Sequence, residues 1–275
     1  MSTLLRPTLA IGAAASVQEF GEGSDVVLML PGSGADRMAL GLQGRALQAA
    51  GMRALSLDYP GLGLSGDLPL PGDMHELVDY AFAVLDALGI ERCHLLGHSL
   101  GSALAQEMAL RSPERARSMV LLATWGRLDP FLALRGRIVS QVVRLGYEDR
   151  TALLPYFMAS RPLVNAMQDG NGALGLRGSR AVSDETMRHY LELARDPDRL
   201  VRLAALQVPA LVVAGERDLM TPPEYGHEVA QALPHAEFQL LRGERASHLF
   251  HYELGEETNG LIVRFLRSLP GPGPN

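Results

Sequence analysis

The chain has 275 residues, of which 47% are hydrophobic and 20% are charged, a composition typical of one globular domain with or without an insertion. Its formal net charge is −6 and its arginines are scattered, so the sequence predicts no nucleic-acid-binding face. The single cysteine, Cys93, excludes an intramolecular disulfide and a metal site built from several cysteines.

The first residues raise the question of a signal peptide or a membrane segment. An apolar stretch at residues 4–17 is interrupted by Pro7 and Gly12, and its only charge, Arg6, lies inside it. We therefore interpret the stretch as a first β-strand. No apolar run in the chain approaches the ~20 residues that a membrane-spanning helix needs. The sequence predicts a cytoplasmic protein with no membrane partner.

The next part of the chain alternates short apolar runs with helical patterns. Runs typical of buried strands lie at residues 26–30, 52–57, 93–96 and 118–123. Helical patterns lie between them at residues 36–50, 74–88 and 100–111. Asp36 is a plausible N-cap for the first helix and Gly51 a plausible C-cap. This alternation predicts an α/β fold with a mostly parallel central sheet flanked by helices.

The pattern changes after the sixth strand and later returns. Residues 125–206 show no convincing strand, but helical patterns at 131–144 and 185–194 and a glycine-rich polar loop at 168–179. The alternation then resumes with strands at 210–214 and 237–241 and helices at 223–233 and 254–269. The sequence thus predicts a core domain of residues 1–124 and 207–275, with residues 125–206 as a helical insertion.

One motif carries chemistry. Gly97-His98-Ser99-Leu100-Gly101 matches Gly-x-Ser-x-Gly and lies between a predicted buried strand and a predicted helix. A serine on such a sharp turn is exposed above the sheet edge, close to a helix N-terminus that favours negative charge. The glycines leave room for the tight turn. We predict that Ser99 is a nucleophile.

A serine nucleophile needs a base, and the base needs an acid. His248 follows the last strand at the same edge of the sheet and is the preferred base, with His251 second. Asp218 follows the strand at 210–214 and is the preferred acid, with Glu216 and Asp129 as alternatives. The order Ser, Asp, His is the one expected of a nucleophile elbow on an α/β sheet.

The same reaction needs donors for an oxyanion. The backbone N–H of Leu100, the residue after the nucleophile, is one predicted donor. The other is the N–H of Ser33 in the loop Pro31-Gly32-Ser33-Gly34, whose two glycines let the backbone approach a substrate closely. The sequence therefore predicts an oxyanion hole between two strand ends.

These motifs resemble the α/β-hydrolase fold family, in its group of esterases, lactonases and cofactor-free haloperoxidases. The resemblance covers residues 20–123 and 207–268. It departs where Pro31 replaces the family's histidine, where Pro60 replaces an arginine, and where Ser247 replaces the glycine before the base. Serine at position 99 argues against the aspartate-nucleophile members, the dehalogenases and epoxide hydrolases.

In the family, a helical lid occupies the place of residues 125–206 and shapes the substrate pocket. Here the predicted pocket residues are Trp125, Phe131, Tyr156 and Met158. Arg127 and Arg135 are further candidates, for a substrate carboxylate.

The expected activity is hydrolysis of a small-molecule ester, lactone or thioester through an acyl-enzyme, without a metal or organic cofactor. Two alternatives remain open. One is an acyltransferase or a cofactor-free lyase or cyclase that uses the same three residues, and the other is a ligand-binding receptor of the same fold. The sequence does not predict the oligomeric state or the natural substrate.

Overall fold

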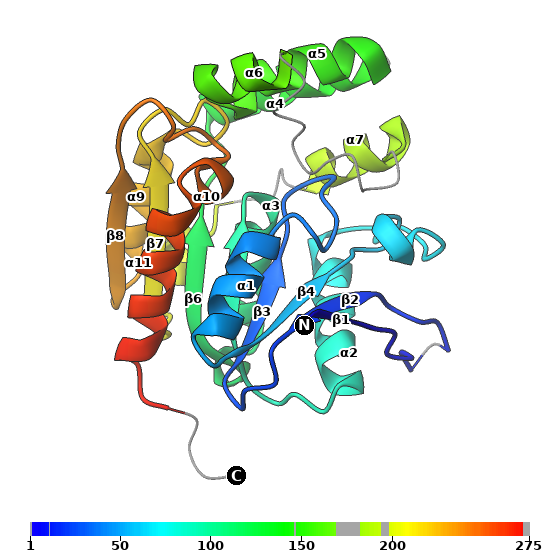
Figure 1. The fold of residues 1–275 in the computed structure, drawn as a ribbon, viewed down its shortest axis with the longest axis vertical. Helices are drawn as coiled ribbons and strands as arrows, with labels where there is room; N and C mark the ends of the chain where they lie inside the picture. The colour runs from blue at the N-terminus through cyan, green and yellow to red at the C-terminus, as the bar shows by residue number, and fades with distance from the viewer. Residues whose placement is uncertain (1, 11, 146, 169–181, 194–197, 272–275) are drawn as a thin grey trace.

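An eight-stranded sheet runs through the molecule (Figure 1). The computed structural model describes residues 2–10, 12–145, 147–168, 182–193 and 198–271. The strands lie in the order β1-β2-β4-β3-β5-β6-β7-β8, and all neighbours from β4 to β8 pair in parallel, whereas β1 and β2 are antiparallel. Their bounds are β1 Ser2–Leu5, β2 Val17–Phe20, β3 Val26–Leu30, β4 Arg53–Leu57, β5 Cys93–His98, β6 Ala116–Leu122, β7 Ala210–Gly215 and β8 Ala236–Leu241.

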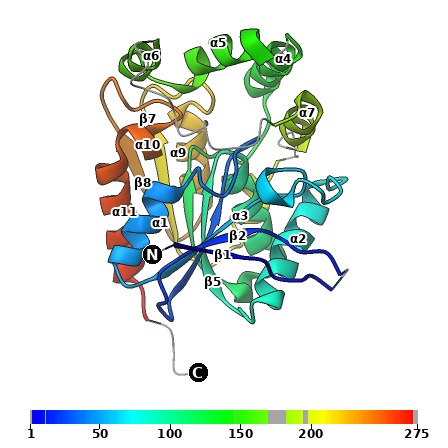
Figure 2. The same ribbon diagram turned by 45° about the vertical axis from the view of Figure 1, so that its right-hand side comes forward.

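Helices cover both faces of the sheet. Helices α1 (Gly41–Ala49) and α11 (Gly255–Ser268) lie on the near face in Figure 1, and α2 (Met74–Ala87), α3 (Leu100–Arg111) and α9 (Pro223–Ala232) lie on the other (Figures 1 and 2). Side chains of β3 alternate between the two cores: Leu28 packs in one cluster and Met29 in the other. Each buried leucine or methionine contributes about 1.5–3 kcal/mol, so the two-sided burial fixes the position of the central strands.

The remaining short elements are η1 (Gly63–Ser65), η2 (Pro113–Arg115) and α10 (Phe250–Glu253). Among the helices that the structure describes, none combines the length and the apolar character needed to cross a bilayer.

Two local predictions are wrong. The helix expected from residue 36 begins at Gly41, and the Asp36 carboxylate accepts the N–H of Met38 at 2.8 Å within a turn that precedes the helix. The single strand expected at residues 4–17 is two strands, of which β1 ends at Leu5 and β2 begins at Val17.

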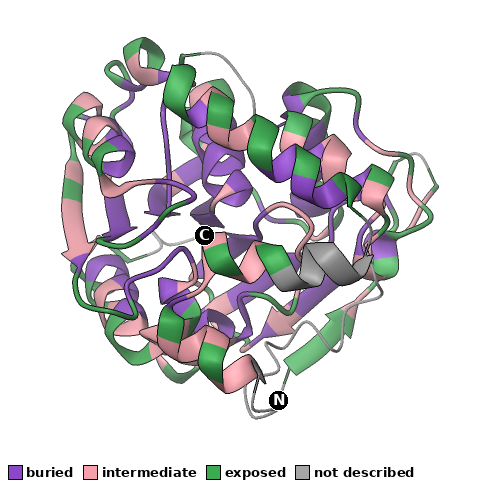
Figure 3. Cartoon of the chain, turned by 90° about the horizontal axis from the view of Figure 1, so that it is seen from above, coloured by how far each residue is buried: buried purple, intermediate pink, exposed green. Residues whose placement is uncertain are grey.

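Between β6 and β7 the chain forms helices α4 (Pro130–Arg144), α5 (Tyr147–Met158), α6 (Arg161–Gln168), α7 (Asp184–Leu193) and α8 (Leu200–Leu203). We call residues 125–206 the helical segment. Helices α4 to α7 lie beyond the carboxyl ends of the parallel strands (Figures 1 and 2), and much of their surface is exposed or half-buried (Figure 3). The loop predicted at residues 168–179 falls almost wholly outside the described residues. Catalytic loops of parallel sheets lie at this carboxyl edge.

Candidate active site

Ser99 occupies a strained turn between β5 and α3. Its φ is +54°, in the left-handed region that residues other than glycine rarely adopt. Its N–H donates to the carbonyl oxygen of Leu122 at 2.9 Å, and its own carbonyl oxygen accepts the hydroxyl of Ser102 at 2.6 Å. Ser99 is half-buried although its two neighbours are fully buried, so the turn presents the serine at the edge of the sheet.

The two glycines of the motif are required by close backbone approach. A β-carbon built on Gly97 would lie 2.1 Å from the carbonyl oxygen of Gly101. A β-carbon built on Gly101 would lie 1.9 Å from the carbonyl oxygen of Leu30. The turn therefore forms only with glycine at both positions.

His248 and Asp218 form a buried hydrogen-bonded pair. The Nδ1 atom of His248 lies 2.8 Å from Oδ2 of Asp218 and 3.0 Å from Oδ1. The carboxylate also accepts the N–H groups of Met220 and Thr221 and the hydroxyl of Thr221, each at 2.8 Å. A carboxylate accepts hydrogen bonds, so His248 is the donor in this pair and its ring proton lies on Nδ1.

His98, the residue before Ser99, connects this pair to the turn. Its Nε2 donates to the carbonyl oxygen of His248 at 3.0 Å, and the two rings lie 4.8 Å apart. The loop that carries His248 is thus fixed directly beside the β5–α3 turn.

The alternative residues lie in other arrangements. His251 is buried, and its Nδ1 has no hydrogen-bond partner among the described residues. Glu216 accepts the N–H of Gly243 on the surface. Asp129 caps α4 by accepting the N–H of Leu132 at 2.9 Å, and it accepts the hydroxyl of Tyr225 at 2.8 Å. The structure pairs only Asp218 with His248 among these three carboxylates.

Three buried histidines lie together at the turn. The ring of His251 lies 4.0 Å from that of His98 and is tilted by 45° to it, and His98 in turn contacts His248. Burial, with a smaller effect of neighbouring His248, lowers the pKa of His251 to about 3. Burial, with smaller effects of His251 and His248, also holds the pKa of His98 well below its ordinary value. Both rings are therefore neutral near neutral pH.

This burial predicts a pH dependence of stability. An unfolded histidine takes up a proton near pH 6.5, but His251 in the folded state does so only near pH 3. Between these values the unfolded state binds one proton more, so the free energy of unfolding falls as the pH falls, by up to about 1.4 kcal/mol per pH unit from this residue. In urea titrations from about pH 6 to about pH 4, we expect His251→Gln to flatten the decline.

The matched control is His75→Gln, which removes an exposed histidine of α2 and is expected to leave the decline unchanged. Equal slopes for His251→Gln and the wild type would show that His251 is not kept neutral by the fold.

The loop after β3 lies against Ser99. A β-carbon built on Gly32 would lie 3.4 Å from the Ser99 β-carbon. The N–H of Ala35 donates to the carbonyl oxygen of Gly32 at 3.1 Å, and Gly34, at φ +71°, closes this turn. Ser33 is thus at the tip of a turn beside the serine. The N–H of Leu100 belongs to the first turn of α3, where no intrahelical acceptor exists.

Comparisons with known proteins identify the family of the chain. Residues 25–252 match the model of a family described as the alpha/beta hydrolase fold. The chain belongs to the α/β-hydrolase family. The crystal structure of "Putative non-heme bromoperoxidase BpoC" from Mycobacterium tuberculosis superposes with a TM-score of 0.83, with 27% identity over 94% of this chain and 97% of that one. A sequence match to that protein has 30% identity over 90% of this chain and 96% of the relative.

Two further relatives have other activities in their names. The dihydrolipoyllysine-residue acetyltransferase component of an acetoin cleaving system from Pseudomonas putida is 32% identical over 90% of this chain, which spans 65% of that protein's length. A 2-hydroxy-6-oxononadienedioate/2-hydroxy-6-oxononatrienedioate hydrolase from the same organism is 28% identical over 90% of both chains. The family relatives thus include hydrolases.

The four predicted pocket residues differ in burial and in their contacts. Trp125 is buried, and the guanidinium of Arg199 lies 6.0 Å from its ring. Phe131 and Tyr156 are 57% and 71% exposed. Met158 lies beside the loop that carries His248, because its carbonyl oxygen accepts the N–H of Leu249 at 3.2 Å. The roles of these four residues stay predictions.

The helical segment contacts the loop that carries His248 at a second point, which the sequence did not predict. Glu253 accepts the hydroxyl of Ser247 at 2.6 Å and the N–H of Ser160 at 2.9 Å, and its other oxygen accepts the Ser160 hydroxyl. One carboxylate therefore joins α10, the residue before His248 and the segment between α5 and α6. A glutamate five residues after the base carried no sequence signal for this role.

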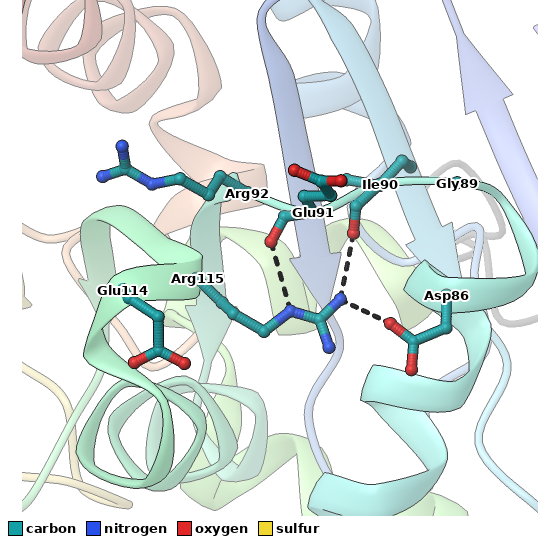
Figure 4. Close-up of a pocket in the computed structure, with 7 residues that line it drawn as sticks. All are labelled: Asp86, Gly89, Ile90, Glu91, Arg92, Glu114 and Arg115. Carbon is teal, nitrogen blue, oxygen red and sulfur yellow. Dashed lines mark hydrogen bonds and ion pairs between the residues drawn. The ribbon is translucent and has the colours of Figure 1, made fainter.

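An open groove lies at the opposite end of β5 (Figure 4). Arg115 spans it and donates to Oδ1 of Asp86 at 2.6 Å and to the carbonyl oxygens of Ile90 and Glu91 at 3.0 and 3.1 Å. Asp86, Ile90 and Glu91 precede β5, so the strand's six residues, about 20 Å, separate the groove from Ser99. The charge of Arg115 is paired with that of Asp86. In the part of the chain that the structure describes, no group of three His, Cys, Asp or Glu could hold a metal ion.

Proposed function

We propose that this α/β-hydrolase is a serine hydrolase that cleaves a small-molecule carboxylic ester, lactone or thioester through an acyl-enzyme on Ser99. The observation that carries the proposal is the hydrogen-bonded connection from the Ser99 turn through His98 to His248 and on to Asp218. Acyl transfer needs a nucleophile, a base and an acid that are linked in this order at one edge of the sheet.

In the proposed reaction the Ser99 hydroxyl oxygen attacks the substrate carbonyl while Nε2 of His248 takes its proton. Nδ1 is engaged with Asp218, so Nε2 is the nitrogen left to act as base. The oxyanion accepts the N–H groups of Leu100 and Ser33. Collapse of the intermediate releases the alcohol or thiol, which takes the proton from His248, and water then hydrolyses the acyl-enzyme by the same steps.

We further propose that residues 125–206 are a lid on a core of residues 1–124 and 207–275. Support comes from contacts of the helical segment with two loops of the site. Leu249, next to His248, donates to Met158, and a β-carbon on Gly34 would lie 2.6 Å from the sulfur of Met187. A lid of this kind excludes water and shapes the acyl pocket.

The test is labelling with a fluorophosphonate probe, followed by peptide mapping of the labelled residue, alongside turnover of nitrophenyl esters with short and long acyl chains. We expect label on Ser99 and turnover of one chain-length class, with Ser99→Ala as the blank. Label on another residue, or a folded protein that neither labels nor turns over any ester, would contradict the proposal. Label without turnover would favour an acyltransferase, a lyase or a receptor.

A further inference from the structure

A half-buried arginine of the helical segment lies beside the loop that carries Asp218. Arg135 of α4 donates through Nη1 to the carbonyl oxygen of Met220, and its buried Nε has no hydrogen-bond partner among the described residues. No ion pair found in the described part of the chain involves it. Burial lowers the pKa of Arg135, and the nearby Asp218 carboxylate opposes that effect. A buried cation without a close counter-ion is costly to a fold.

Met220 connects this cation to the carboxylate. Its carbonyl oxygen accepts Arg135, and its N–H donates to Oδ1 of Asp218 at 2.8 Å. Asp218 in turn holds Nδ1 of His248 at 2.8 Å. One continuous set of hydrogen bonds therefore runs from α4 to the proposed base.

We propose that Arg135 is a positioning residue: it fixes the Asp218 loop from the helical segment, and its positive charge disfavours a second positive charge on the imidazole of His248. The proposal rests on the proposed function for its meaning in catalysis. The electrostatic reasoning is that a positive charge in a poorly solvated surrounding disfavours a second positive charge nearby.

The other groups around the pair do not supply this charge. His98 and His251 face His248 and are neutral, since burial lowers their pKa values. Tyr225 faces Arg135, and its hydroxyl is committed to Asp129. Glu253 accepts hydrogen bonds from Ser160 and from Ser247, the residue before His248. Among these groups, Arg135 is the one that carries a positive charge near neutral pH.

The experiment compares Arg135→Met, which removes the charge but keeps an unbranched apolar stem, with Arg135→Lys, which retains the charge. For a neutral ester we expect the acidic limb of the kcat/KM profile of Arg135→Met to move up by about one pH unit, because imidazolium forms more easily. Arg135→Lys should stay close to the wild type. Arg137→Met, an exposed arginine of the same helix, is the matched control and should change neither limb nor rate.

A second readout does not depend on turnover. The NMR titration of the His248 ring, assigned with His248→Gln, should have a higher midpoint in Arg135→Met by the same amount, even if no ester is hydrolysed. Failure of the proposed function and failure of this inference are therefore distinguishable. Arg135→Gln replaces Arg135→Met if the latter does not fold.

Two results would overturn the inference. An unchanged titration midpoint with a lower kcat would leave Arg135 a merely structural residue. A rise in KM confined to esters that carry a carboxylate, again with no pH shift, would make it a substrate-binding residue.

Discussion

Asp218→Asn is expected to lower kcat/KM by about 10⁴-fold while the protein stays folded. The amide has nearly the shape of the carboxylate and can still accept the N–H groups of Met220 and Thr221. Its NH₂ group, however, would donate to Nδ1 of His248, which moves the ring proton to Nε2. A base protonated at Nε2 cannot take the proton of Ser99. The measurement is steady-state kinetics on the best nitrophenyl ester, with circular dichroism to verify folding.

The other two carboxylates considered from the sequence are natural controls. Glu216→Gln changes a surface carboxylate that binds Gly243, and Asp129→Asn retains a residue type that caps helices well. Both variants should keep kcat/KM within a few-fold of the wild type. If Asp218→Asn stayed active while either control lost activity, the acid would have been assigned to the wrong residue.

The sequence could predict on which side of the sheet the proposed site residues lie. Ser99, Asp218 and His248 follow strands β5, β7 and β8, and carboxyl ends of parallel strands converge at one edge. The helix at residues 100–111 was predicted with its observed bounds, because a glycine-bounded turn begins it and Ser112-Pro113 ends it.

The sequence could not predict the contacts that hold the site from a distance. Arg135 lies 85 residues from Met220, and Ser160 lies 93 residues from Glu253. Such pairs depend on how the helical segment packs, and nothing in the local pattern specifies that packing. The hydrogen bond between Thr221 and Asp218 is local, and a hydroxyl three residues after an aspartate often binds it in a turn.

The start of α1 shows the same limit at short range. Asp36 has the residue type of a cap, but its neighbour Arg37 forms an ion pair with Asp58. The distance from Nη1 of Arg37 to Oδ2 of Asp58 is 2.8 Å. Asp58 is fully buried and also accepts the N–H groups of Arg37 and Leu64, each at 2.8 Å. A tertiary ion pair thus fixes residues 37–40 as turns and delays the helix to Gly41.

Gly101→Ala is expected to have the largest effect on stability, with a loss of more than about 4 kcal/mol or no soluble protein at all. The added methyl group would lie 1.9 Å from the carbonyl oxygen of Leu30 and 2.6 Å from that of Pro31. Both obstacles are backbone atoms of β3 and of the loop beside Ser99, so neither can move aside as a flexible side chain would. Accommodation would require α3 to shift away from the sheet, which would also displace Ser99.

Gly136→Ala provides the opposite case within the same chain. Gly136 lies inside α4, and a β-carbon built on it meets no atom within 4 Å. Alanine there should raise the free energy of unfolding by about 0.5–1 kcal/mol, since it restricts the unfolded chain and favours the helix. Urea denaturation of both variants tests the pair. A Gly101→Ala protein as stable as the wild type would mean that the close contact between α3 and β3 does not form as described, and the geometry of the Ser99 turn would then need a different explanation.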